Sequence, residues 1–136
     1  MTVRHLTPTS VAAPIGKFSH VVTCAPGSAL AFVSGQIGAR QDGSIVAGGA
    51  TEQARQAFLN FEAILAELGA TPNDVVKMMT FVVGDDGFVG FARARDEAFA
   101  KWYPDDRFPA HSAAVVSRLA TEELLVEFEA VVALTS

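Results

Sequence analysis

Residues 51–68 read TEQARQAFLNFEAILAEL, and this stretch decides much of the fold. Its apolar residues recur every three or four positions, which places them along one face of an α-helix. Thr51 is suited to cap the start of this helix, and Gly69 is suited to end it in a left-handed conformation. The stretch therefore predicts a helix that packs one face against the rest of the molecule. The face consists of Ala54, Ala57, Phe58, Phe61, Ile64, Leu65 and Leu68.

A strand and a second helix follow in the sequence. Residues 75–83, VVKMMTFVV, have the β-branched character and the length of a strand buried on at least one face. The segment 84–87, GDDG, breaks that pattern. A stripe at helical spacing then runs until Pro104 and comprises Phe88, Phe91, Arg95, Phe99 and Trp102. We interpret the stripe as core packing against a sheet, with a ligand platform as the alternative.

Shorter apolar segments complete the expected fold. Residues 19–24 and 30–34 flank the turn-like segment 25–28, so they are interpreted as a hairpin. Residues 113–116 and 124–134 are expected to form the last strands. The order of elements predicts an α+β sandwich in which both helices cover one sheet face, formed by a single domain over residues 1–136.

Composition narrows the classes of function. Half of the 136 residues are hydrophobic and only 18% are charged, so some apolar surface is expected to be buried between subunits. The formal net charge of −5 and the lack of a basic run argue against a nucleic-acid partner. No apolar run is long enough to cross a bilayer. The single cysteine, Cys24, fits a cytoplasmic location and is interpreted as a core residue, with a reactive thiol as the alternative.

Two titratable side chains near the C-terminus are candidates for chemistry. His111 follows Pro109, which restricts the local backbone, and lies sixteen residues before Glu127, within possible reach of it. Glu127 and Glu129 share one face of the last strand, which is either solvated or lines a cleft that favours a general base. The three histidines lack the spacing of a metal site, and no motif indicates a cofactor.

Several blocks of the sequence resemble the RidA/YjgF family of imine and enamine deaminases, also described as L-PSP endoribonucleases. They occur in the family's order from about Ala13 to Leu134. The blocks are residues 13–20 (APIGKFSH), 33–37 (VSGQI), 53–57 (QARQA), 74–82 (DVVKMMTFV), 107–112 (RFPAHS) and 126–130 (VEFEA). The family signature Arg-Pro-Ala-Arg-Ser corresponds to the fifth block, with His111 in place of its second arginine.

The resemblance implies a chorismate-mutase-like α+β fold that assembles as a homotrimer, with small-molecule clefts between adjacent subunits. It implies that Glu127 positions a hydrolytic water and that Ser34, Gly35 and Pro109 help to form the cleft. Three positions depart from the family pattern, because Phe18 replaces a tyrosine, Ala92 replaces an asparagine and His111 replaces the arginine that holds the substrate carboxylate. Histidine lacks the planar fork with which arginine binds a carboxylate. A role for Arg107 in compensating for that loss is a further alternative.

These observations favour a Rid-like hydrolase that acts on a small imine or enamine other than an ordinary 2-imino acid. Under this hypothesis Glu127 positions water, while His111 recognises or protonates the substrate. The alternative is a non-catalytic, metabolite-binding or chaperone-like family member, because fold similarity does not guarantee activity. Ribonuclease activity has the least support in so acidic a chain.

Overall fold

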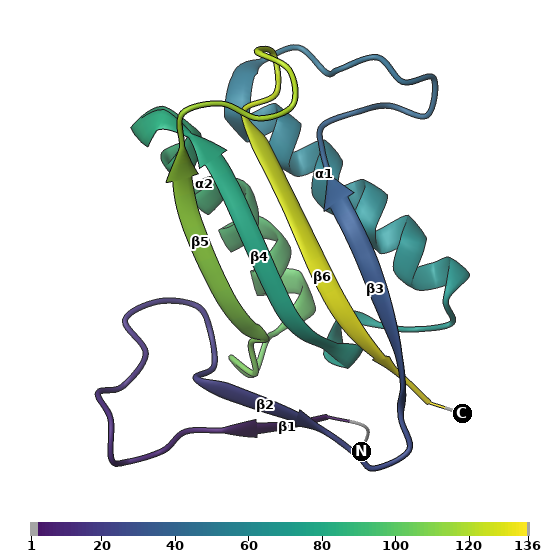
Figure 1. The fold of residues 1–136 in the computed structure, drawn as a ribbon, viewed down its shortest axis with the longest axis vertical. Coiled ribbons are helices and arrows are strands. Elements are labelled where there is room, and N and C mark those ends of the chain that lie inside the picture. Colours follow the sequence, from purple (N-terminus) through teal and green to yellow (C-terminus); the bar gives the residue numbers. More distant parts are fainter. Residues whose placement is uncertain (1–2, 136) are drawn as a thin grey trace.

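The computed structural model describes residues 3–135, and its main feature is a four-stranded sheet in the order β3-β6-β4-β5 (Figure 1). β4 and β5 are parallel and the other neighbours are antiparallel, so the sheet is mixed. The strands of this sheet are β3 (Ala29–Gln36), β4 (Val75–Val83), β5 (Ala110–Val116) and β6 (Val126–Leu134). The other elements are β1 (Val3–Leu6), β2 (Val21–Cys24), α1 (Gly49–Glu67), the 3-10 turn η1 (Pro72–Asp74) and α2 (Gly84–Trp102).

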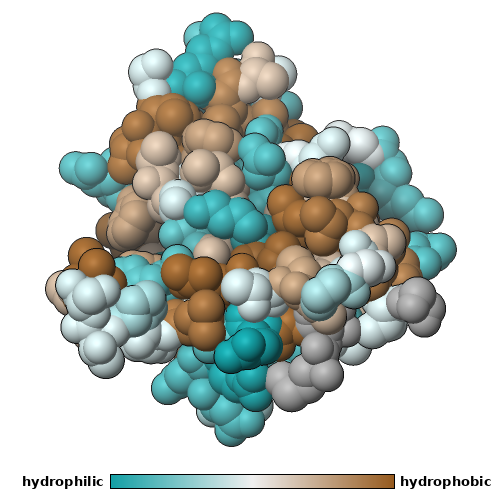
Figure 2. Space-filling view, turned by 60° about the horizontal axis from the view of Figure 1, so that its bottom comes forward, coloured by the Kyte–Doolittle hydropathy of each residue, from teal (hydrophilic) through white to brown (hydrophobic). Residues whose placement is uncertain are grey.

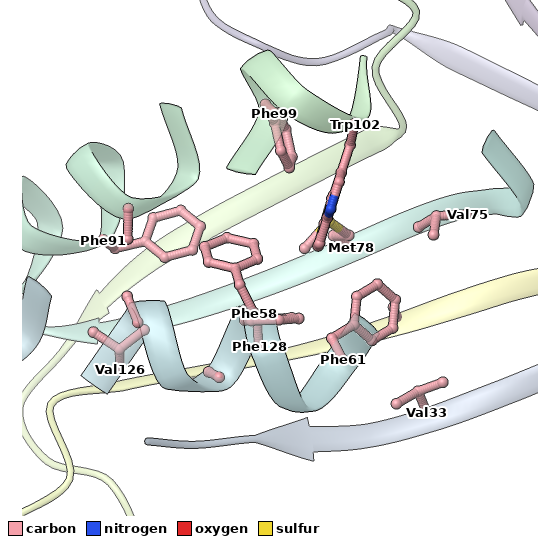
Figure 3. Close-up of a cluster of buried hydrophobic side chains, with 14 of the residues drawn as sticks. Val33, Phe58, Phe61, Val75, Met78, Phe91, Phe99, Trp102, Val126 and Phe128 are labelled. Atoms are coloured by element: carbon pink, nitrogen blue, oxygen red, sulfur yellow. The ribbon is translucent and has the colours of Figure 1, made fainter. Parts of the chain in front are cut away.

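Both helices lie on the same face of the sheet, as the sequence predicted (Figure 1). Aromatic side chains fill the space between the two layers (Figure 3). The ring of Phe58 on α1 packs against Phe91 of α2 and Phe128 of β6, with centroid distances of 5.8 and 4.9 Å. Burial of these rings supplies the main hydrophobic stabilisation of the fold.

The predicted helix boundaries are correct except at their starts. α1 begins at Gly49 after Gly48, which has a positive φ of 110°, so Thr51 lies inside the helix and its predicted role as the cap is wrong. Gly69 has a φ of 66° and ends α1 as predicted. Gly84 also has a positive φ, 68°, which lets the chain turn directly from β4 into α2. The segment 84–87 therefore forms the first helical turn instead of a break.

The predicted hairpin of residues 19–24 and 30–34 is wrong. β2 pairs with β1 in a separate two-stranded sheet, whereas β3 pairs with β6. The turn at 25–28 does form, with a hydrogen bond from Ser28 N to Ala25 O of 3.2 Å, but it joins strands of two different sheets. The pairing with β6 places Val33 of β3 in the core between the sheet and the helices. The partner of β3 is therefore determined by burial in the core and not by the adjacent turn.

The sheet face that the helices leave free is partly apolar. Phe32 and Leu30 of β3 are 76% and 46% exposed, and Phe32 is paired with Val131 of β6. The sheet of β1 and β2 covers one end of this face, where Val3 packs with Val76 and Ala133. A space-filling view from the β1–β2 end shows apolar patches separated by polar residues (Figure 2). We call this side of the sheet the open face.

Candidate active site

A cavity of about 340 Å³ lies between the edge strand β5, helix α2 and the loop before β2. The loop contributes apolar and basic side chains, α2 contributes two rings and an arginine, and β5 contributes three consecutive residues. The lining consists of Ile15, Gly16, Lys17, Phe18, Phe88, Phe91, Arg95, His111, Ser112 and Ala113. A pocket of this size accommodates a small metabolite.

His111 lies on the helix side of β5. Its register partner is the buried Met78, and its Nε2 is 2.7 Å from the hydroxyl of Thr80. The edge of its ring meets Phe91 at a centroid distance of 6.0 Å. Burial, together with the positive charges of Arg95 and Lys77, lowers the pKa of His111 to about 4. The imidazole is therefore neutral at pH 7 and acts as a hydrogen-bonding group, without the charge of an arginine.

Pro109 contributes to the cavity by holding the loop that carries Phe18. The carbonyl of Pro109 accepts a 3.1 Å hydrogen bond from the backbone N–H of Ser19, and the Ser19 hydroxyl donates to the carbonyl of Phe108 at 2.6 Å. These bonds fix the loop against the start of β5. Phe18 is thereby brought to the cavity beside His111.

Arg95 is a cavity residue that the sequence interpretation missed. Its side chain is 20% exposed, and its guanidinium carbon lies 6.0 Å from the centre of the Phe91 ring. Nε and Nη2 both donate to one carboxylate oxygen of Asp96, at 3.2 and 3.0 Å. Arg95 is the charged member of an otherwise aromatic helical stripe, and this was the signal in the sequence that could have identified it.

Glu127 and Gly35 lie together on the open face, and Ser34 precedes Gly35 in β3. The register between β3 and β6 shifts between Val33 and Gln36, so Ser34 and Gly35 form a bulge. A Cβ atom at Gly35 would lie 2.5 Å from Cδ of Glu127, so only glycine permits this approach of the carboxylate to the strand. Gly35 and Glu127 therefore lie close together, and Ser34 is the neighbour of Gly35 in the bulge.

The two groups lie on opposite sides of the sheet. Glu127 is paired with Phe81 on β4, one residue along from the buried Thr80 that contacts His111. Successive residues of a strand point to opposite faces. The expected reach between His111 and Glu127 therefore does not occur within one chain.

The last two predicted site residues lie outside the cavity lining. Ala92 is half-buried on α2, on the helical face between Phe88 and Arg95. Arg107 is exposed and does not line the cavity, and its charge contributes, after burial, to lowering the pKa of His5 on β1. Arg107 is therefore poorly placed to replace a charge at position 111.

Within residues 3–135, no cluster of three or more histidine, cysteine, aspartate or glutamate side chains is arranged to hold a metal ion. None of the helices in this range combines the length and the apolar character that crossing a membrane requires.

The family model for Endoribonuclease L-PSP matches residues 9–134. The chain belongs to the RidA/YjgF family. A 2-iminobutanoate/2-iminopropanoate deaminase of Dermatophagoides farinae is 32% identical over 120 residues, which are 88% of this chain and 87% of that protein. This relative confirms the family that the sequence blocks indicated.

Solved structures of Rid proteins share the fold. A Rid family protein of unknown function from Yersinia pestis, YyfB, has a TM-score of 0.83 and 29% identity, and the match covers 98% of this chain and 100% of that chain. E. coli TdcF, solved with bound serine, has a TM-score of 0.69 and 26% identity over 97% of this chain and 99% of that chain. The predicted chorismate-mutase-like α+β fold is therefore correct.

Proposed function

We propose that this Rid protein hydrolyses a small imine or enamine metabolite in a cleft between two subunits of a homotrimer. One relative is named a deaminase of 2-imino acids, and another was solved with bound serine. Both support a small nitrogen-containing ligand. The chain also retains a carboxylate, Glu127, at the position where the family resemblance implies the water-activating group.

The observation that carries the proposal is the separation of the two residue groups by the sheet. Glu127 lies beside Gly35 on the open face, and His111 lies in the cavity on the other side. Exposed Phe32 and Leu30 make the open face suitable for burial against a second copy. Glu127 of one subunit can then act on a ligand held in the cavity of another subunit. Within one chain the sheet separates Glu127 from that cavity.

Each residue has a defined role in the proposed reaction. Glu127 accepts a proton from water as the water oxygen forms a bond to the carbon of the C=N group. Glu127 passes this proton to the nitrogen, which gives an amino alcohol. Its hydroxyl proton then moves to the nitrogen as the C–N bond breaks, so that ammonia leaves and a carbonyl compound remains. His111, neutral and fixed by Thr80, hydrogen-bonds the substrate. This assignment favours recognition over acid catalysis for His111, since at pH 7 its ring is almost always the neutral imidazole and not the imidazolium cation.

The substrate is proposed to differ from an ordinary 2-imino acid. A neutral imidazole at position 111 gives no bidentate, charge-assisted pair to a carboxylate. Phe18 adds no hydroxyl group and Ala92 adds no amide group. Selectivity is therefore expected to shift away from the substrates of the named deaminase.

The test is an imine-trapping assay. An amino-acid oxidase generates imines from a panel of amino acids, semicarbazide traps them, and added protein competes by hydrolysis. We expect faster imine loss for part of the panel, and a rate that falls by about 100-fold or more in Glu127→Gln. Glu129→Gln is the matched control, because Glu129 lies two residues along on the same face and is expected to leave the rate unchanged.

Two results of this assay would contradict the proposal. No acceleration for any imine would rule against hydrolysis, and rapid turnover of the simplest 2-imino acids would rule against the altered selectivity. Equal rates of imine hydrolysis for wild type and Glu127→Gln would contradict the proposed role of Glu127 in activating water.

A non-catalytic metabolite-binding or chaperone-like role is the second candidate. The cavity has large apolar side chains in Phe18, Phe88 and Phe91, and its histidine is neutral. These features suit binding without chemistry. Thermal stabilisation by a ligand that is never turned over would favour this role.

The remaining expectations are part of the same proposal. Residues 1–136 act as one domain without a cofactor, and the partners are copies of the chain and a small molecule. Neither nucleic acid nor membrane is a partner. A cytoplasmic location agrees with the free thiol of Cys24.

A further inference from the structure

The cavity between β5 and α2 contains an arginine on a largely aromatic wall. The guanidinium of Arg95 is 6.0 Å from the Phe91 ring centre, and the Arg95 side chain is mostly buried. An aromatic wall lowers the local dielectric, so a charge here interacts more strongly with a ligand than a charge in bulk water does. Arg95 therefore has the environment of a ligand-binding cation.

Arg95 also has N–H donors that the contact with Asp96 does not use. A guanidinium carries five N–H donors. Two of its nitrogens, Nε and Nη2, share a single oxygen of Asp96, and Nη1 has no hydrogen-bond partner among residues 3–135. The ion pair with Asp96 thus orients the guanidinium without using its full donor set, and leaves room for a second acceptor.

The charges around Arg95 leave this end of the cavity positive. Lys17 also lines the cavity, and its ammonium is 3.2 Å from the same Asp96 oxygen. Two cations therefore face one carboxylate. Lys17 is the more exposed of the two and gives a hydrated point charge, whereas a guanidinium is weakly hydrated and planar.

We propose that Arg95 is the anion-binding residue of this cavity, and that its ligand is a small carboxylate with a short apolar chain. The carboxylate accepts hydrogen bonds from the guanidinium. The chain lies against Phe18, Phe88 and Phe91, and the ring of His111 faces the polar part of the ligand.

This inference deepens the proposed function and rests on it for identifying the cavity as the substrate site. Arg95 extends from α2, whereas position 111 lies on β5. An anion held by Arg95 therefore lies against the helix wall, and its reacting carbon is placed differently from that of a ligand anchored at position 111. In an ordinary 2-imino acid the C=N carbon is bonded to the carboxylate carbon, so binding at Arg95 would hold the reacting carbon at the helix wall. Anion binding by Arg95 is therefore compatible with the proposed selectivity against such substrates.

The test measures binding without turnover. Protein-observed NMR titrations at pH 7 and low salt compare butanoate with its uncharged analogue butanamide, using the full chain. We expect wild type to bind butanoate about tenfold more tightly than butanamide. Arg95→Gln should lose about tenfold in butanoate affinity with little change for butanamide, and Arg95→Lys should lie between them.

Arg93→Gln is the matched control, because Arg93 is exposed on the same helix and does not line the cavity. It removes the same net charge and is expected to bind butanoate as wild type does. A loss in Arg93→Gln equal to that in Arg95→Gln would overturn the inference, since it would indicate a general charge effect.

Equal affinities of wild type for butanoate and butanamide would also overturn the inference, even if no variant folds. So would a change of less than about twofold in a folded Arg95→Gln protein. Failure here is separable from failure of the proposed hydrolysis. If butanoate binding depends on Arg95 but no imine is turned over, the anion-binding role of Arg95 stands and the proposed hydrolysis is contradicted.

Discussion

The two faces of the sheet differ in what covers them. The face toward α1 and α2 is closed by interlocking rings, with Phe58, Phe61 and Phe128 fully or almost fully buried. The open face carries Phe32 and the carboxylates of Glu127 and Glu129, and no helix of residues 3–135 lies over it. The first face accounts for the stability of one chain, and the second is suited to contact with other molecules.

The largest effect is expected on the covered face. Phe128→Ala removes a ring that packs against Phe58 and Phe61, and should lower the free energy of unfolding by about 3–5 kcal/mol. Urea unfolding at a fixed protein concentration measures this loss. A loss below about 1 kcal/mol would contradict the assignment of the core to this face.

A smaller effect is expected from His111 when the pH falls. Its pKa is about 4 in the folded chain, against about 6.5 in an unfolded chain, so the unfolded state takes up a proton first. Stability from the neutral ring is complete above pH 6.5, and about 3 kcal/mol of it is lost as the pH falls toward 4. His111→Gln should flatten this part of the unfolding free energy measured against pH. The same slope in both proteins would contradict a buried, neutral His111.

The smallest effect on the fold of one chain is expected from the open face. Phe32→Ser changes a ring that is 76% exposed, so the far-ultraviolet circular dichroism spectrum should stay the same. Light scattering should nevertheless show a mass below that of three chains, because the proposed subunit contact loses an apolar anchor.

Leu59→Ser is the control for assembly, since Leu59 is 58% exposed but lies on α1, away from the sheet. It should leave the mass in solution unchanged. A wild-type protein with the mass of a single chain would contradict the proposed assembly altogether.

Local patterns in the sequence correctly predicted most of the elements that form the sheet face covered by α1 and α2. The strand at 75–83 and the stop at Gly69 follow from β-branched content and from a left-handed turn, both of which depend on near neighbours in the chain. The alternation in the last strand also placed Glu127 and Glu129 on one face correctly.

Features that depend on pairing between distant segments were not predictable in the same way. β3 was assigned to a hairpin because of the turn beside it, but its partner is β6, about a hundred residues away. The face of His111 depends on the register of β5 against β4, which no local pattern encodes. Arg95 was taken as part of a packing stripe, because helical spacing does not distinguish a core position from a cavity wall at the edge of that core.

The central claim is that Glu127 of one subunit acts on a ligand in the cavity of another, and mixed oligomers test it most directly. His111→Ala and Glu127→Gln chains are produced separately and also co-expressed with different tags, and imine hydrolysis is measured on the doubly tagged oligomers. If the site is shared, each doubly tagged trimer regains about one third of its sites, because a closed ring with both variants has one site that joins an intact cavity to an intact carboxylate of the neighbour. Activity in the mixture no higher than that of the two separate variants would contradict the account.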